Sequence, residues 1–186
     1  MLLYVCRHGE TEWNRDRKLQ GQLNSPLTSL GVQQATEMAS KASAWALTGI
    51  WSSHLGRAKH TADICATTLK VSHTVDERLC ERSFGEWEGK PMATLPDYLE
   101  FRKYRYTQPE RMPDNGGENA NSVAARLSDA LHHIARSSRG NALVISHGDA
   151  MACLARTFSQ GRKIGNCSGY TLCAENGELH WGSWLD

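Results

Sequence analysis

Two short apolar runs place the strongest constraint on how this chain folds, because each can form one buried strand and each ends in His-Gly. Residues 2–6 precede Arg7-His8-Gly9, and residues 142–146 precede His147-Gly148. Continuous apolar runs of this length are typical of strands buried on both faces in a parallel sheet. Ligands of such sheets bind outside the carboxyl ends of the strands. We therefore expect both histidines at the ligand-binding edge of one sheet.

The rest of the chain alternates segments of helical period with shorter strand-like runs. Helices are expected over 28–42, 57–69, 91–106, 121–137 and 151–158, and further strands over 50–53, 71–75, 170–173 and 179–184. The first of these helices should carry Thr28 as its cap and bury Val32 with the alanines that follow. Residues 11–26 and 77–89 are expected to form irregular loops at the site. Such alternation predicts an α/β fold with a mainly parallel sheet flanked by helices.

Composition narrows the class of protein. Hydrophobic residues make up 40% of the chain and charged residues 22%, as in ordinary globular domains. The formal net charge of +1 argues against nucleic acid as a partner. We find no apolar run suited to a signal peptide or a membrane span. The six cysteines have no C-x-x-C spacing, so reduced core thiols in a cytoplasmic protein are expected.

A series of motifs runs along almost the whole chain. In order, its members are Arg7-His8-Gly9, Glu10-Thr11-Glu12-Trp13-Asn14, Gln20-Gly21, Pro26-Leu27-Thr28-Ser29-Leu30-Gly31, Leu55-Gly56-Arg57-Ala58, Glu81, Phe84-Gly85-Glu86-Trp87-Glu88-Gly89, Gly116-Gly117-Glu118 and Ser146-His147-Gly148. In this order the series resembles the histidine phosphatase superfamily, also called the phosphoglycerate-mutase-like family. The resemblance implies a three-layer sandwich, formed by one domain over 1–186 with a cap-like insertion around 90–117.

The chemistry of these residues agrees with the resemblance. Transfer of a phosphoryl group depends mainly on positioning and on stabilisation of negative charge. Arg7 and Arg57 can each bind phosphate oxygens with a planar fork of donors, and His147 can donate to the same oxygens. His8 must be neutral to attack phosphorus, and the neighbouring arginines favour its neutral form. The family implies these same roles, with His8 forming the phosphohistidine.

A carboxyl group is needed to protonate the leaving oxygen and later to deprotonate water. Glu81 matches the position of the family's proton donor, with Glu86 and Glu88 as nearby rivals. The competing structural interpretation of Glu81 is a surface carboxylate or an ion-pair partner of Arg78 or Arg82.

Further contacts with phosphate or substrate are expected from Asn14, Gln20, Gly21 and Gly148. The two amides offer donors, Gly21 permits close approach of the backbone, and Gly148 can offer a backbone N–H at a helix start. A basic lip from Arg102, Lys103, Arg105 and Arg111 is possible, although a solvated helix face is an equal alternative. Trp13 and Trp87 lie in the expected site loops, where they can touch substrate.

Two positions depart from the family pattern. His60 stands where glutamine is common, and Asn119 follows Gly-Gly-Glu where serine is usual. The chain also ends soon after its last expected strand, whereas the family's mutases carry insertions and a tail that shield the phosphoenzyme from water. A short, open site favours hydrolysis.

The sequence thus predicts a metal-independent phosphomonoesterase that acts through phosphohistidine at His8, without a cofactor. Its expected partners are a small phosphorylated metabolite and, as product, inorganic phosphate, with neither nucleic acid nor membrane. The chain looks similar to short bacterial members, which include broad-specificity and α-ribazole phosphatases. The alternatives are a phosphoglycerate mutase and, from another class, a non-catalytic module that binds a phosphate ligand or a protein.

Overall fold

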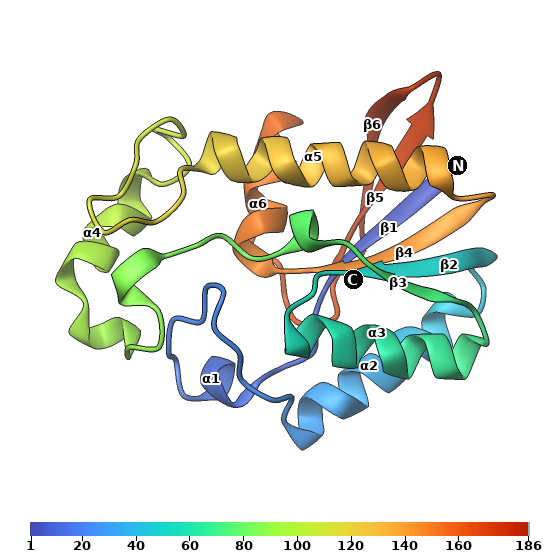
Figure 1. The fold of residues 1–186 in the computed structure, drawn as a ribbon, viewed down its shortest axis with the longest axis horizontal. Helices are drawn as coiled ribbons and strands as arrows, with labels where there is room; N and C mark the ends of the chain where they lie inside the picture. The colour runs from blue at the N-terminus through green and yellow to red at the C-terminus, as the bar shows by residue number, and fades with distance from the viewer. Residues whose placement is uncertain (186) are drawn as a thin grey trace.

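A six-stranded sheet forms the centre of the protein in the computed structural model, which describes residues 1–185 (Figure 1). The order of its strands is β3-β2-β4-β1-β5-β6. Neighbours are parallel from β3 to β1 and antiparallel from β1 to β6. The strands are β1 (Leu2–Arg7), β2 (Leu47–Ser52), β3 (His73–Val75), β4 (Asn141–Ser146), β5 (Gly169–Glu175) and β6 (Glu178–Leu185).

The two apolar runs followed by His-Gly become neighbouring central strands. In the register of β1 and β4, Arg7 lies opposite Ser146, so His8 and His147 leave the sheet at the same edge. The four core residues of each run, from Leu3 to Cys6 and from Ala142 to Ile145, are buried. The prediction of two histidines at one edge of a mainly parallel sheet is confirmed.

Helices cover both faces of the sheet and complete three layers (Figure 1). α5 (Ala120–Ser137) and α6 (Gly148–Thr157) pack on one face, and α2 (Ser29–Ala42) and α3 (Gly56–Leu69) on the other. Polar side chains cap two of them: the Thr28 oxygen accepts from Gly31 N at 3.0 Å, and Asn119 Oδ1 accepts from Ser122 N at 2.8 Å. The unusual Asn119 is therefore a helix cap. Among residues 1–185, no helix is long and apolar enough to span a membrane.

The segment 90–117, called the cap segment below, lies beside the carboxyl edge of the sheet. It contains the short helix η3 (Met92–Thr94) and α4 (Pro96–Tyr104). A separate small core fastens it to the site loop, because Tyr98 and Phe101 pack edge-on against Phe84, with ring centroids 5.9 and 6.3 Å away. Figure 1 shows this segment away from the sheet layers.

Several local expectations were wrong for identifiable reasons. The helix expected over 91–106 is broken, because Pro96 begins a new helix at its first position. Residues 11–26 are not wholly irregular, since Thr11 caps the one-turn helix α1 (Glu12–Arg15). Residues 77–89 contain two 3₁₀ turns, η1 (Glu77–Leu79) and η2 (Gly85–Trp87). Val32 is 38% exposed instead of buried.

Candidate active site

The connection before β5 holds the backbone of Arg7 and His8, at the end of β1, through two hydrogen bonds to their carbonyls. The N–H of Cys167 donates to the Arg7 carbonyl at 3.0 Å, and the side-chain amide of Asn166 donates to the His8 carbonyl at 3.0 Å. On the other side, His8 N donates to the Ser146 carbonyl at 3.1 Å. The motif series did not indicate Asn166, which lies outside every motif.

The hydrogen bonds of the His8 ring select one tautomer. Nδ1 lies 2.7 Å from the carbonyl oxygen of Gly9, so Nδ1 carries the proton and donates it. Nε2 accepts from Arg57 Nε at 3.2 Å and therefore holds the lone pair. Burial, with the charges of Arg57 and Arg7, lowers the pKa of His8 well below its usual value. His8 is thus a neutral imidazole with a nucleophilic Nε2 facing a guanidinium.

Arg57 is fixed at the start of α3 by the loop that precedes α2. Its Nη1 donates to the Leu23 carbonyl at 2.6 Å and its Nη2 to the Gly21 carbonyl at 2.7 Å. Burial lowers the pKa of Arg57 to about 10, which leaves it charged at neutral pH. The carbonyl of Gly21 thus orients Arg57, a role that differs from the predicted contact with substrate, and that contact stays a prediction.

Arg7 projects from the end of β1 toward the start of α6. Its Nη1 donates to the Ile164 carbonyl at 3.0 Å, while Nε is buried without a hydrogen-bond partner among the described residues. A Cβ on Gly148 would lie 3.2 Å from this Nε, so the glycine permits the close approach of Arg7. Arg7 therefore retains a fixed donor for an anion.

His147 lies beside His8 and is fully buried. The two ring centroids are 5.2 Å apart, and neither nitrogen of His147 has a hydrogen-bond partner within residues 1–185. Burial and the nearby charges of Arg57 and Arg7 lower the pKa of His147 well below its usual value. An unpartnered buried imidazole is costly, and an anion at His8 would satisfy its N–H.

Glu81 is held at the N-terminus of α6. Its Oε1 accepts from Arg82 N and Ala150 N, both at 2.8 Å, and Oε2 accepts from Asp149 N at 3.2 Å. Burial and the charge of Asp149 raise the pKa of Glu81, against the opposing effect of Arg57 and the backbone donors. The carboxyl therefore keeps its proton to higher pH than an exposed glutamate.

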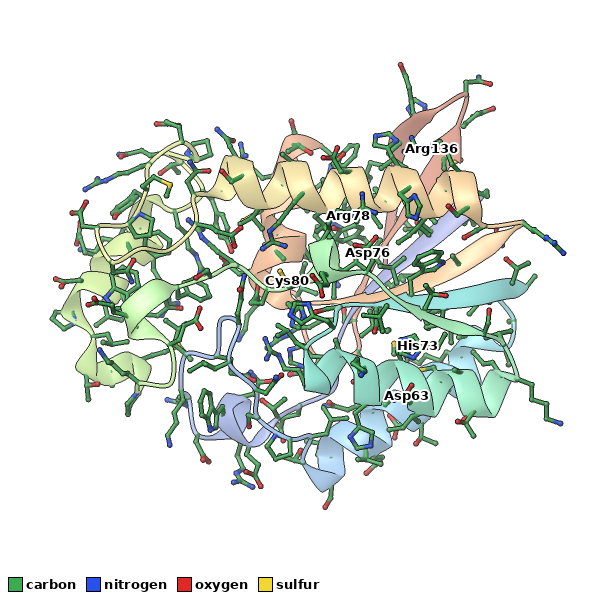
Figure 2. The ribbon with its side chains drawn as sticks, in the orientation of Figure 1. Asp63, His73, Asp76, Arg78, Cys80 and Arg136 are labelled. Carbon is green, nitrogen blue, oxygen red and sulfur yellow. The ribbon has the colours of Figure 1, made fainter. Side chains whose placement is uncertain are left out.

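The two arginines named as alternative ion partners of Glu81 pair with other carboxylates: the Arg82 guanidinium binds Asp149 Oδ2 at 3.4 Å, and it is the backbone N–H of Arg82 that donates to Glu81. Arg78 binds Asp76 at 2.6 Å, on the segment that leads to Glu81 (Figure 2). Glu88 Oε1 accepts from Phe84 N at 2.8 Å and closes its own loop, while Glu86 is exposed. Among the described glutamates, Glu81 is the one that lines the cavity.

These groups meet in a cavity of about 600 Å³. It is lined by eight of the nine predicted site residues: Arg7, His8, Asn14, Gln20, Gly21, Arg57, Glu81 and Gly148. His147, the ninth, contacts His8. Asn14 Oδ1 accepts from Thr11 N and from the Asn166 amide, both at 3.3 Å, so its own NH₂ is the group left to donate.

The remainder of the cavity wall combines apolar and basic side chains from several elements. Apolar and aromatic members include Leu19, Phe84, Met92, Tyr98, Tyr106, Ala152, Ala155 and Ile164, and the further basic members are Lys18, Arg102, Arg105, Arg156, Arg162 and Lys163. Of the expected basic lip, Arg102 and Arg105 line the cavity. Lys103 instead pairs with Glu100, and the Arg111 guanidinium lies 3.9 Å from the centre of the Tyr104 ring. Neither Trp13 nor Trp87, both expected in the site loops, lines this cavity. Trp87 instead packs against Phe101, with ring centroids 5.4 Å apart.

Known proteins share both the sequence pattern and the fold. A probable phosphoglycerate mutase, GpmB, of Salmonella arizonae is 38% identical over 160 residues, covering 84% of this chain and 74% of that protein. The structure of Bacillus stearothermophilus YhfR is similar with a TM-score of 0.87 and 29% identity, over 98% of this chain and 95% of that one. A mycobacterial glucosyl-3-phosphoglycerate phosphatase solved with VO3 gives a TM-score of 0.86 and 26% identity, over 98% and 96%.

The family assignment extends over almost the whole sequence. Residues 3–184 match the family model of the histidine phosphatase superfamily (branch 1). The matched range includes the His8 turn, Arg57, Glu81 and His147, which the fold gathers at one edge of the sheet. This chain belongs to the histidine phosphatase superfamily.

Proposed function

We propose that the protein is a phosphomonoesterase that hydrolyses small phosphorylated metabolites through a phosphohistidine at His8. The observation that carries the proposal is the neutral His8 ring, whose Nε2 lone pair faces Arg57 beside the protonatable Glu81. A binding module needs the two arginines but has no use for an aligned nucleophile and a carboxyl of raised pKa.

In the first step, His8 Nε2 attacks phosphorus and the bond from phosphorus to the ester oxygen breaks. Attack takes the lone pair that Arg57 Nε–H now binds, and this N–H is then available to a phosphoryl oxygen. Arg7 Nε and the His147 ring, both without partners among the described residues, supply further donors to the transferring group. Glu81 gives its proton to the leaving oxygen, so a neutral alcohol departs.

In the second step, Glu81 acts as the base. It takes a proton from water, the resulting hydroxide oxygen attacks phosphorus, and the P–N bond breaks. The electron pair returns to His8 Nε2, inorganic phosphate leaves, and Glu81 is again protonated. The cycle needs no other reactant than water and the ester.

The cavity supports substrates larger than phosphate itself. A volume of about 600 Å³ falls within the range of pockets that enclose whole small molecules. Apolar side chains of the cap segment line the cavity, where they can contact the leaving group. The basic residues of the cavity wall favour anionic metabolites. The same volume leaves room for the water that hydrolysis requires.

A phosphoglycerate mutase is the second candidate, because the relatives that are 38% identical carry the name of a probable phosphoglycerate mutase. A mutase must retain the phosphohistidine until the substrate has turned round, so it excludes water from the same site. The two functions share the first step and differ in the fate of the phosphoenzyme.

Release of phosphate from a panel of phosphomonoesters tests the proposal, with EDTA present and His8→Ala as the blank. We expect release by the wild-type protein alone. Isomerisation of 3-phosphoglycerate that depends on traces of 2,3-bisphosphoglycerate, without net release of phosphate, would instead establish the mutase. Vanadate binding with neither release of phosphate from any ester nor isomerisation of 3-phosphoglycerate would favour a binding module and contradict the proposal.

A further inference from the structure

The cap segment and the base of the site meet at one buried carboxylate, Asp149. This residue follows His147-Gly148 and lies in the first turn of α6. Its Oδ1 accepts from the Tyr106 hydroxyl and from Arg105 Nη1, the latter at 2.8 Å. Its Oδ2 pairs with Arg82 Nη1 at 3.4 Å. Asp149 thus binds three side chains, and two of them come from the cap segment.

The same residue contacts Glu81 through its backbone. The N–H of Asp149 donates to Glu81 Oε2 at 3.2 Å, and that of the next residue, Ala150, to Oε1 at 2.8 Å. A displacement of Asp149 would therefore move the donors that orient the Glu81 carboxyl. Asp149 therefore connects the cap segment, through its side chain, to the Glu81 carboxyl, through its backbone N–H.

The partners of Asp149 are themselves fixed by aromatic rings. The Arg105 guanidinium lies 4.6 Å from the Tyr106 ring centre, and the Arg82 guanidinium lies 4.5 Å from that of Phe101. Arg82 Nε also donates to the Glu118 carbonyl at 2.8 Å. Because Phe101 belongs to α4 and to the small core of the cap segment, Arg82 ties Asp149 to that core, while Arg105 and Tyr106 bind Asp149 from the cap segment itself.

We propose that Asp149 is a positioning residue that fastens the cap segment over the cavity and, through the same carboxylate, keeps Glu81 competent as the acid. The second half rests on the proposed function, which assigns the proton donation to Glu81. The first half concerns the placement of the cap segment and stands whether or not the protein turns over an ester.

The electrostatic part follows from the groups that face the two carboxyls. Asp149 is faced by Arg82, Arg105, Tyr98, Tyr106 and Cys153, and Glu81 is faced by Arg7, Arg57, Arg126, Cys80, Cys153 and Asp149. After burial, the negative charge of Asp149 is the largest influence that raises the pKa of Glu81. Loss of that charge leaves Glu81 facing cations, which favour its ionised form.

The variant Asp149→Asn tests this part, because it keeps an oxygen acceptor for Tyr106 but removes the charge. Carbon-13 NMR of the glutamate carboxyls gives the titration of Glu81, with Glu81→Gln assigning the signal. We expect its proton affinity to fall about tenfold or more, which is about one pKa unit. The pH above which kcat/KM declines for glycerol 2-phosphate should fall equally.

The variants Tyr106→Phe and Asp149→Ala test the fastening of the cap segment. Hydrogen exchange of the amides in α4, together with tryptic cleavage after Lys103, reports how often the segment opens. We expect Asp149→Ala to accelerate both processes at least tenfold. Tyr106→Phe should give a smaller acceleration while the Glu81 titration stays in place, since both carboxyls remain.

The matched control is Asp76→Asn, which removes a comparably buried carboxylate paired with Arg78 (Figure 2). It should leave the Glu81 titration and the exchange of α4 unchanged. An unchanged Glu81 titration in Asp149→Asn, or an unchanged exchange of α4 in Asp149→Ala, would overturn the proposal. Absence of phosphate release from the wild-type protein would instead count against the proposed function, because NMR and exchange need no turnover.

Discussion

Replacement of Glu81 by glutamine gives the sharpest test of the proposed chemistry, because it keeps the shape of the side chain and removes its proton. An alkyl phosphate such as glycerol 2-phosphate needs a proton on its leaving oxygen, whereas p-nitrophenolate leaves as a stable anion. General acid catalysis contributes about 10²- to 10⁴-fold to rate. We expect the first step with glycerol 2-phosphate to slow by that factor, and that with p-nitrophenyl phosphate to change little.

The hydrogen bonds around Glu81 set the accompanying loss of stability. Three backbone N–H groups donate to the carboxyl, two of them to Oε1 and that of Asp149 to Oε2. Glutamine has one side-chain oxygen, and we expect it to accept from the N–H groups of Arg82 and Ala150. The NH₂ group of the glutamine then faces the N–H of Asp149, and neither of these two groups can accept a hydrogen bond from the other. An unsatisfied buried donor costs about 1–3 kcal/mol, and the unfolding free energy should fall by that amount.

Rapid-quench measurement of alcohol release in single turnovers isolates this first step from hydrolysis of the phosphoenzyme. In free-energy terms, the expected barrier increase for glycerol 2-phosphate is about 2.7–5.4 kcal/mol. Equal slowing of both esters would refute Glu81 as the acid. Urea unfolding in parallel should show a population that remains almost fully folded, so that the rates refer to the native protein.

Three further perturbations test the remaining groups. Gly148→Ala places a Cβ 3.2 Å from Arg7 Nε, so inhibition by inorganic phosphate should weaken about tenfold while thermal stability does not fall, since alanine favours a helix. Arg57→Lys should lower kcat/KM at least about 100-fold, because lysine cannot bind two carbonyls and the His8 lone pair at once; a loss below tenfold would contradict this role. Burial lowers the pKa of His147 in the folded protein, so just below pH 6.5 the unfolded chain binds a proton at this residue and the folded protein does not. The contribution of His147 to the unfolding free energy is therefore full above pH 6.5 and is lost as the pH falls toward the folded-state pKa. His147→Gln should reduce the acid slope by up to about 1.4 kcal/mol per pH unit in urea unfolding, and an unchanged slope would show that this residue is not buried neutral.

The sheet was predictable from the sequence because its evidence is local. Apolar runs end in polar residues at β1 and β4, and Asn176-Gly177, both with positive φ, marks the turn between β5 and β6. The helix boundaries were missed where one residue overrides a long pattern. Pro96 breaks the helix expected over 91–106, and α6 starts at Gly148, three residues before the expected 151.

The site was predictable only as far as its motifs extend. The motif series singled out eight residues that line the cavity, but it contained no signal for Asn166, which binds the backbone of His8 from a distant segment. It likewise gave no role to Asp149, whose importance depends on meeting Arg105 and Tyr106 in space. Such supports come from pairings of residues far apart in the chain, which spacing along the sequence does not encode.

The hydrogen bonds that Cys167 and Asn166 donate to the end of β1 also affect when this site can form during synthesis. Arg7 and His8 are made before Cys167 and Asn166, which bind their carbonyls from about 160 residues later in the chain. Within the described part of the chain, β1 pairs with β4 and β5 alone. Until β4 and β5 have been made, a nascent chain therefore has neither of these neighbours for β1, and the backbone at His8 is not yet held in place. Such distant pairing slows folding, and it delays assembly of the cavity around His8 until β4 and β5 have emerged from the ribosome.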